Sequence, residues 1–193
     1  LGMQQDSGYR VARAFTAIDR ENPLDLVEVE ETFGIGAVIR REIETPVVVR
    51  LHGPWCVVGP KLGHPKDKEF WMRCAAEYHA IRRASAISSP SLDALEQVRA
   101  AYRMELPDAR VIPNPVAIPD RDDHFSRAKA DPNRILFVGR FDRVMGADIL
   151  LQAFARVAKD RPALRLIFIG PDSRLIHGGR EIGFEEYLRE QVP

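Results

Sequence analysis

Residues 134–172 read RILFVGRFDRVMGADILLQAFARVAKDRPALRLIFIGPD, and this stretch decides the fold of the chain. An apolar run over 135–138 ends at Gly139, and a short polar loop leads to Gly146. An amphipathic segment follows, and a second apolar run over 164–169 ends at Gly170. Apolar runs bounded by glycine are typical of buried strands, and the spacing between them is helical. The pattern predicts a strand–loop–helix–strand unit.

Arg140 stands where the first predicted strand meets the loop. In open α/β sheets, ligands bind beyond the carboxyl ends of the strands. A helix that begins near Gly146 would direct its free N–H groups to the same place, and a guanidinium suits phosphate oxygens. We therefore expect Gly139, Arg140 and Gly146 to form an anion site. The alternative is a tight turn in which Arg140 pairs with Asp142 or Asp148.

The rest of the chain repeats the alternation of strands and helices, which predicts an α/β fold with parallel sheets. Strands are expected over 24–29, 46–51, 85–88 and 109–113, helices over 8–22, 32–42, 66–83 and 91–103, and a Gly- and Pro-rich loop over 53–65. The run over 46–51, PVVVRL, is typical of a strand covered on both faces. The helix over 148–159 is expected to pack through one face, formed by Ile149, Leu150, Ala153, Phe154 and Val157.

The segment 113–133 contains four prolines and no apolar period, so it is the best linker in the chain. We expect a first domain over 1–119, a linker over 120–133 and a second domain over 134–193. The chain begins at Leu1 and stops directly after an amphipathic segment, 184–192. We therefore expect both domains to be incomplete and the chain to be part of a longer protein.

Composition excludes several classes of protein. Apolar residues make up 45% and charged residues 29%, and 28 basic residues balance 28 acidic ones, so no net field favours nucleic acid. No apolar run is long enough to span a membrane, although a peripheral membrane contact stays open. Cys56 and Cys74 form no CxxC motif, and we expect reduced core thiols in a cytoplasmic protein. The histidines show no metal-ligand spacing, so we expect no metal site.

Two further positions could carry chemistry. His52 and Gly53 follow the strand predicted over 46–51, where an imidazole could contact a ligand and glycine would leave space for it. The alternative is a histidine that bonds a backbone carbonyl. Asn114 stands between two prolines, and its side chain either caps that turn or contacts a ligand.

Together these motifs resemble the GT-B-fold glycosyltransferases of the group-4 type. The resemblance runs from about Leu24 to Asp172 and rests on PVVVRLHG (46–53), EYHAIRRASAISSPSLDAL (77–95), VIPNPV (111–116), ILFVGRFDRVMGADILLQAFARV (135–157) and LRLIFIGPD (164–172). It implies two Rossmann-like domains that hold a nucleoside-diphosphate sugar between them. It also implies transfer of the sugar, with retention and without a metal or other cofactor, to the hydroxyl of a carbohydrate, lipid or small-molecule acceptor.

The resemblance assigns roles to the candidate residues. Arg140 would neutralise the departing diphosphate, with Gly139 and Gly146 beside it. His52 would contact the donor sugar or the reacting centre. Gly53 and Asn114 would complete the donor site, and His52 and Arg140 would be the catalytic pair.

Two departures from the family pattern bear on activity. Met145 replaces the family's lysine, which removes the second cation expected beside the diphosphate. In the family, the E-x7-E motif lies further into the second domain than this chain reaches. Glu69 and Glu77 have the same spacing, but they lie in the first domain and we do not expect them to form this motif. We expect a retaining glycosyltransferase that is inactive as this piece alone. The alternative is a non-catalytic GT-B-like binding or scaffold subunit, and a nicotinamide-dependent oxidoreductase fails for want of GxGxxG.

Overall fold

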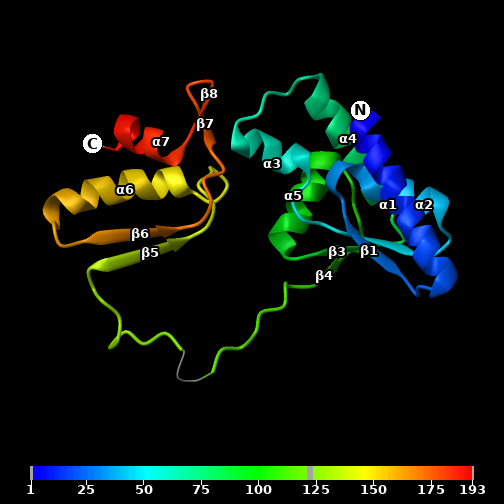
Figure 1. The fold of residues 1–193 in the computed structure, drawn as a ribbon, viewed down its shortest axis with the longest axis horizontal. Coiled ribbons are helices and arrows are strands. Elements are labelled where there is room, and N and C mark those ends of the chain that lie inside the picture. Colours follow the sequence, from blue (N-terminus) through cyan, green and yellow to red (C-terminus); the bar gives the residue numbers. More distant parts are fainter. Residues whose placement is uncertain (1, 121–123, 193) are drawn as a thin grey trace. The chain divides into compact units, whose positions relative to one another are not determined.

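In the computed structural model, which describes residues 2–120 and 124–192, the chain divides into two compact units. The first unit comprises residues 1–60 and 65–115, and the second comprises residues 61–64 and 116–193. Figure 1 shows strands flanked by helices in each unit. Within the described residues, no helix is both long and apolar enough to cross a bilayer.

The first unit contains a four-stranded parallel sheet in the order β1-β2-β3-β4. The strands are β1 (Val27–Glu30), β2 (Val47–Arg50), β3 (Ala86–Ser89) and β4 (Arg110–Val111). The helices are α1 (Gly2–Glu21), the 3-10 turn η1 (Thr32–Gly34), α2 (Ile35–Glu42), α3 (Trp55–Leu62), α4 (Lys68–Arg83) and α5 (Leu92–Tyr102). Because helices connect successive strands, the strands run parallel, and the predicted α/β class is confirmed.

The core of the first unit lies on one face of this sheet. Val49 pairs with Ile87 across the β2–β3 ladder, and both pack against Ile81 of α4 and Leu95 of α5. The opposite face carries Arg50, whose Nη1 lies 3.4 Å from the Ser88 hydroxyl. The prediction that strand 46–51 is covered on both faces was wrong, because alternate positions of β2 are only half-buried. Arg50 lies on the half-buried face, since an arginine side chain needs polar partners.

Helix α3 was not predicted, since its glycine and prolines indicated a loop. The N–H groups of Val57 and Val58 both donate to the Pro54 carbonyl, which starts the helix. Gly59 is tightly packed inside this helix, because a Cβ there would lie 3.0 Å from the Trp55 ring and 3.1 Å from the Phe70 ring, and these rings would have to shift.

The second unit contains a parallel pair of strands, β5 (Arg134–Val138) and β6 (Arg165–Ile169), joined through α6 (Ala147–Asp160). A hairpin of β7 (Leu175–His177) and β8 (Arg180–Ile182) follows, and α7 (Phe184–Gln191) comes last. In Figure 1, α6 lies along one side of the β5–β6 pair. The expected strand–loop–helix–strand unit is present.

Aromatic rings fill the core of the second unit. Phe141 and Tyr187 are each 1% exposed and pack against Phe168, Leu151 and Ile182. The other face of the strand pair stays open to solvent and exposes Leu136, Val138, Ile167 and Ile169.

The buried stripe of α6 is not the predicted one. Ala147, Leu151 and Ala155 are buried, whereas Ile149 is 70% and Val157 47% exposed. The two stripes are neighbours on the helix, and apolar side chains occur on both. Packing against Phe141 and Tyr187 selects the first stripe, and no sequence period distinguishes them.

Candidate functional site

Arg140 lies directly after β5, at the start of the loop 139–146. Its Nε donates a hydrogen bond to Oδ2 of Asp142 at 2.8 Å, which is one of the two alternatives that the sequence left open. Asp142 is 3% exposed, whereas the Arg140 side chain is 51% exposed. In the part of the chain that the structure describes, Asp142 is the hydrogen-bond partner of the Arg140 side chain, and it engages only Nε. The two Nη atoms therefore remain available to a ligand.

The same carboxylate organises the rest of the loop. Oδ1 of Asp142 accepts the N–H of Met145 at 2.8 Å, and its carbonyl accepts the N–H of Ala147 at 3.4 Å. Gly146 precedes α6 with φ +71°, a left-handed conformation that favours glycine. Asp142 thus connects Arg140, through its carboxylate, to Met145 in the loop and, through its backbone carbonyl, to the first residue of α6.

The charges around this loop balance. Asp148 lies in the first turn of α6, and its Oδ2 is 4.0 Å from Nε of Arg143. Arg140 and Arg143 therefore face Asp142 and Asp148, and Met145, which is 44% exposed, adds no charge. Because the loop carries no excess positive charge, an anion would be held by directed N–H donors and not by a general positive field.

The loops after β5 and β6 touch backbone to backbone. The N–H of Gly139 donates to the Ile169 carbonyl at 2.9 Å. A Cβ added at Gly170 would lie 1.9 Å from the Gly139 carbonyl oxygen, so no larger residue fits without a shift of the backbone. This contact fixes the point at which Arg140 leaves the sheet.

His52 and Gly53 lie at the carboxyl end of β2. The N–H of Leu51 donates to the Ser88 carbonyl at 2.7 Å, and the chain then turns away from the ladder. The His52 side chain is 63% exposed, and its Nδ1 lies 3.8 Å from Oε1 of Glu30. Gly53 has φ +128°, and a Cβ there would lie 3.0 Å from Val58. The imidazole thus faces solvent beside a carboxylate, and among the described residues it does not bond a backbone carbonyl.

Sequence reasoning missed Glu31, which follows β1. Its side chain is 1% exposed and accepts the N–H groups of His52 at 2.9 Å and of Gly53 at 2.8 Å. Burial raises the pKa of this carboxyl, although the backbone hydrogen bonds oppose the shift. The signal that could have found Glu31 is an acidic residue within two positions of the end of a predicted strand, at the sheet edge where ligands bind.

Glu77 is a structural acid and not a solvated one. It is fully buried on α4 and accepts hydrogen bonds from the N–H of Trp55 at 2.5 Å, from Nε of Arg73 at 2.9 Å and from the Tyr102 hydroxyl at 3.4 Å. The Arg73 guanidinium lies 4.0 Å from the Trp55 ring centre and 4.1 Å from that of Phe33. Glu69, eight residues earlier, is exposed. The pair therefore shares a spacing but no site.

The Asn114 side chain is hydrogen-bonded to an arginine of the sheet. Its Oδ1 accepts a hydrogen bond of 2.6 Å from Nη2 of Arg50, which also donates to the Ile112 carbonyl at 2.9 Å. This is neither a cap of its own turn nor a contact with His52. The side-chain oxygen Oδ1 of Asn114 thus accepts a hydrogen bond from Arg50.

The predicted site residues fall in both units. Gly139, Arg140 and Gly146 share one loop of the second unit. In the first unit, His52 with Gly53 follows β2 and Asn114 follows β4, and no hydrogen bond joins them in the described residues. Their roles toward a ligand stay a prediction.

Both cysteines are free thiols. Cys74 is 4% exposed on α4, and Cys56 is partly exposed on α3. Burial and the neighbouring Cys56 thiol raise the pKa of Cys74 to about 12.

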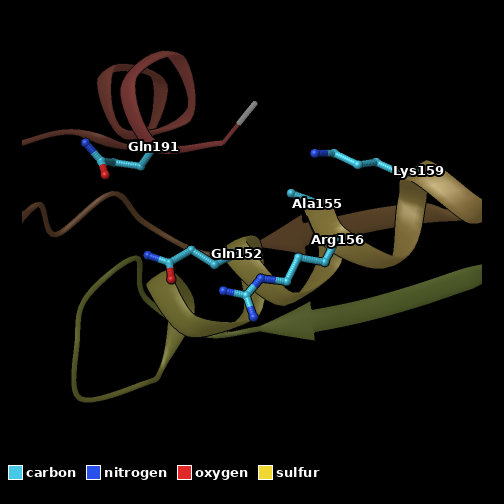
Figure 2. Close-up of a pocket in the computed structure, with 5 residues that line it drawn as sticks. All are labelled: Gln152, Ala155, Arg156, Lys159 and Gln191. Carbon is cyan, nitrogen blue, oxygen red and sulfur yellow. The ribbon is translucent and has the colours of Figure 1, made fainter.

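A surface hollow lies between α6 and α7, away from these residues. Figure 2 shows its lining, which comprises Gln152, Ala155, Arg156 and Lys159 of α6 and Gln191 of α7. None of the predicted site residues lines it. Across residues 2–120 and 124–192, no three acidic, histidine or cysteine side chains gather as metal ligands.

The sequence of the chain can now be compared with models of known families. The model of the family described as "Glycosyl transferase 4-like domain" matches residues 5–115, more than half of the chain. That of the family described as "Glycosyl transferases group 1" matches residues 120–191. The chain belongs to the group-1 glycosyltransferases of the GT-B fold. A search of curated proteins finds no match.

Membership of this family settles the class of activity. The protein belongs to a family of transferases whose substrates are a sugar donor and an acceptor, as the resemblance implied. The matched ranges extend beyond the stretch from Leu24 to Asp172 on both sides. The first match ends at residue 115, where the first unit also ends.

Proposed function

We propose that this glycosyltransferase takes its sugar from a nucleoside diphosphate and transfers it to an acceptor hydroxyl with retention of configuration. The bond between the anomeric carbon and the β-phosphate oxygen breaks, and its electron pair leaves with the diphosphate. The acceptor oxygen forms the new bond to the same carbon and releases its proton to solvent. The negative charge that develops on the diphosphate is what the site must stabilise.

Arg140 carries this proposal. Its Nε is held by buried Asp142, which orients the guanidinium and leaves both Nη atoms on the exposed side. Two parallel N–H donors match the oxygens of a diphosphate. The N–H groups in the first turn of α6 add partial positive charge, although Asp148 offsets part of it. We propose that these groups, with no metal ion, neutralise the leaving diphosphate.

His52 is the proposed partner of Arg140 toward the sugar. Its imidazole is exposed at the carboxyl end of β2, where a sheet of this class binds ligands. A neutral imidazole can donate one hydrogen bond and accept another, which suits sugar hydroxyls. Gly53 and Asn114 are assigned to the donor site on the resemblance alone.

Titration with nucleotides tests the proposal. The chain is titrated with UDP-glucose, GDP-mannose and NADH, and binding is followed by calorimetry. We expect one of the sugar nucleotides to bind and NADH not to bind. Binding of NADH alone would contradict the proposed donor. We also expect this 193-residue chain to transfer no sugar by itself, and turnover in a radiolabelled transfer assay would overturn that expectation.

A further inference from the structure

The turn at the end of β2 is held by a side chain and not by the sheet. After Leu51, the next two N–H groups of the chain, those of His52 and Gly53, have no strand carbonyl to bond. Each donates instead to a separate oxygen of Glu31, at 2.9 Å and 2.8 Å. A bidentate contact of this kind fixes both peptide planes and therefore the direction in which the His52 side chain leaves the backbone.

Glu31 is an unusual residue for a merely structural role. It is 1% exposed, and no lysine, arginine or histidine forms an ion pair with it among the described residues. A buried carboxylate without a cationic partner is costly unless its oxygens are hydrogen-bonded. Glu77 differs, because Arg73 neutralises it. The charged side chain that acts on Glu31 is Glu77, which is also acidic.

The contrast with Glu30 shows what Glu31 does. Glu30 is 54% exposed and approaches the imidazole itself, at 3.8 Å from Nδ1. The Glu31 carboxylate instead accepts hydrogen bonds from the backbone N–H groups of the turn. Glu30 and Glu31 are consecutive residues at the end of β1, and they approach different parts of the turn. Glu30 approaches the imidazole ring of His52, whereas Glu31 accepts the backbone N–H groups.

We propose that Glu31 is the positioning residue of the glycosyltransferase, which holds the His52–Gly53 turn so that the imidazole meets the sugar of the donor. The inference rests on the proposed function, since it takes His52 to contact the sugar and Arg140 the diphosphate. It requires that loss of Glu31 weakens recognition of the sugar while recognition of the diphosphate is kept.

Nuclear magnetic resonance of the chain labelled with 13C and 15N tests the contact without any ligand. In the wild type, we expect the amide signals of His52 and Gly53 to shift together as the Glu31 carboxyl titrates, followed by its own 13C signal. In Glu31→Gln, one of the two acceptor oxygens is replaced by an NH2 donor, so we expect at least one of the two amides to lose protection from hydrogen exchange by about tenfold or more. Glu30→Gln is the matched control and should leave both amides unchanged. Amides that titrate independently of Glu31 would overturn the inference.

Ligand binding separates the inference from the proposed function. Affinities are measured for UDP-glucose and UDP, and for GDP-mannose and GDP. In Glu31→Gln, we expect the preference for the sugar nucleotide over the bare diphosphate to fall by about tenfold, with affinity for the diphosphate kept. An unchanged preference would refute the role of Glu31 and leave the proposed function standing. A wild-type chain that binds none of the four would refute the proposed function, while the amide signals would still decide whether Glu31 holds the turn.

Discussion

Nε of Arg140 lies 2.8 Å from Oδ2 of Asp142, and the second oxygen of this buried carboxylate accepts the N–H of Met145 at 2.8 Å. The residue proposed to meet the diphosphate is therefore anchored through one nitrogen and exposed through the other two. The ion pair between Arg140 and Asp142 does not prevent Arg140 from binding an anion, because neither Nη group takes part in it.

Replacement of Arg140 by alanine should weaken binding of the sugar nucleotide by about ten- to hundredfold, since hydrogen bonds to charged groups contribute about 1.5–3 kcal/mol. Calorimetric titration with UDP-glucose and GDP-mannose measures the loss. Arg143→Ala, which removes the other arginine of the loop, is the control and should have a much smaller effect. Donor affinity that is unchanged in Arg140→Ala would sink the role given to this residue.

Met145→Lys should increase donor affinity by about tenfold, because it adds a charged donor to the loop beside Arg140. Met145 is 44% exposed, so the longer side chain does not need space in the core. Val144→Lys is the matched control, since Val144 is a neighbour with 38% exposure. Equal gains in the two variants would show that added charge acts through the general field and not at a defined position.

Gly170→Ala should lower the free energy of unfolding by about 3 kcal/mol or more, or prevent folding of the second unit, because backbone cannot yield as a side chain does. The added Cβ would lie 1.9 Å from the Gly139 carbonyl oxygen. Gly146→Ala provides the comparison: it has φ +71° but no atom within 4 Å of its added Cβ. Left-handed strain alone costs about 1–2 kcal/mol. Urea unfolding measures both, and equal losses would contradict the close contact.

Cys74 should react with iodoacetamide far more slowly than Cys56 in the folded chain. At pH 8, a thiol with a pKa of about 12 has roughly a thousandfold smaller thiolate fraction than one with a pKa of 9.0. Because the pKa of Cys74 is raised, its thiolate fraction and therefore its rate should still be low at pH 9. Mass spectrometry of the alkylated peptides gives both rates. In denaturant the two should converge, and equal rates in the folded chain would disprove the assignment.

The local pattern of apolar and polar residues in the sequence was sufficient to predict most of the fold. The apolar runs at 135–138 and 164–169 became β5 and β6, and the helical period between them became α6. The class followed because strands and helices alternate along the whole chain. Helix α3 escaped prediction because Gly59 and Pro60 ordinarily mark loops. There, contacts of the Trp55 and Phe70 rings outweigh helix propensity, and these contacts cannot be read from the segment itself.

The positions of Arg140 and His52 at strand ends were predicted, whereas the residues that hold them in place were missed, and the roles of Arg140 and His52 toward a ligand stay a prediction. Arg140 and His52 stand at strand ends, which the sequence makes visible. Glu31 acts on residues 21 and 22 positions later in the chain, and Arg50 on one 64 positions later. A hydrogen bond across such a separation leaves no periodic trace. Even the correct stripe of α6 depended on Phe141 and Tyr187, which only the folded unit brings to it.

Arg50 gives the first unit a mechanical anchor. Strand β4 has only two residues, and the chain beyond it is held by the Nη2 group of Arg50 on the Asn114 side chain and on the Ile112 carbonyl. A pull on the chain beyond Asn114 would load the Arg50–Asn114 bond before the bond of the Ile112 N–H, which donates to the Ser89 carbonyl of β3 at 2.8 Å. Tension in that segment would therefore enter the first unit through a residue of β2, the same strand that ends in His52.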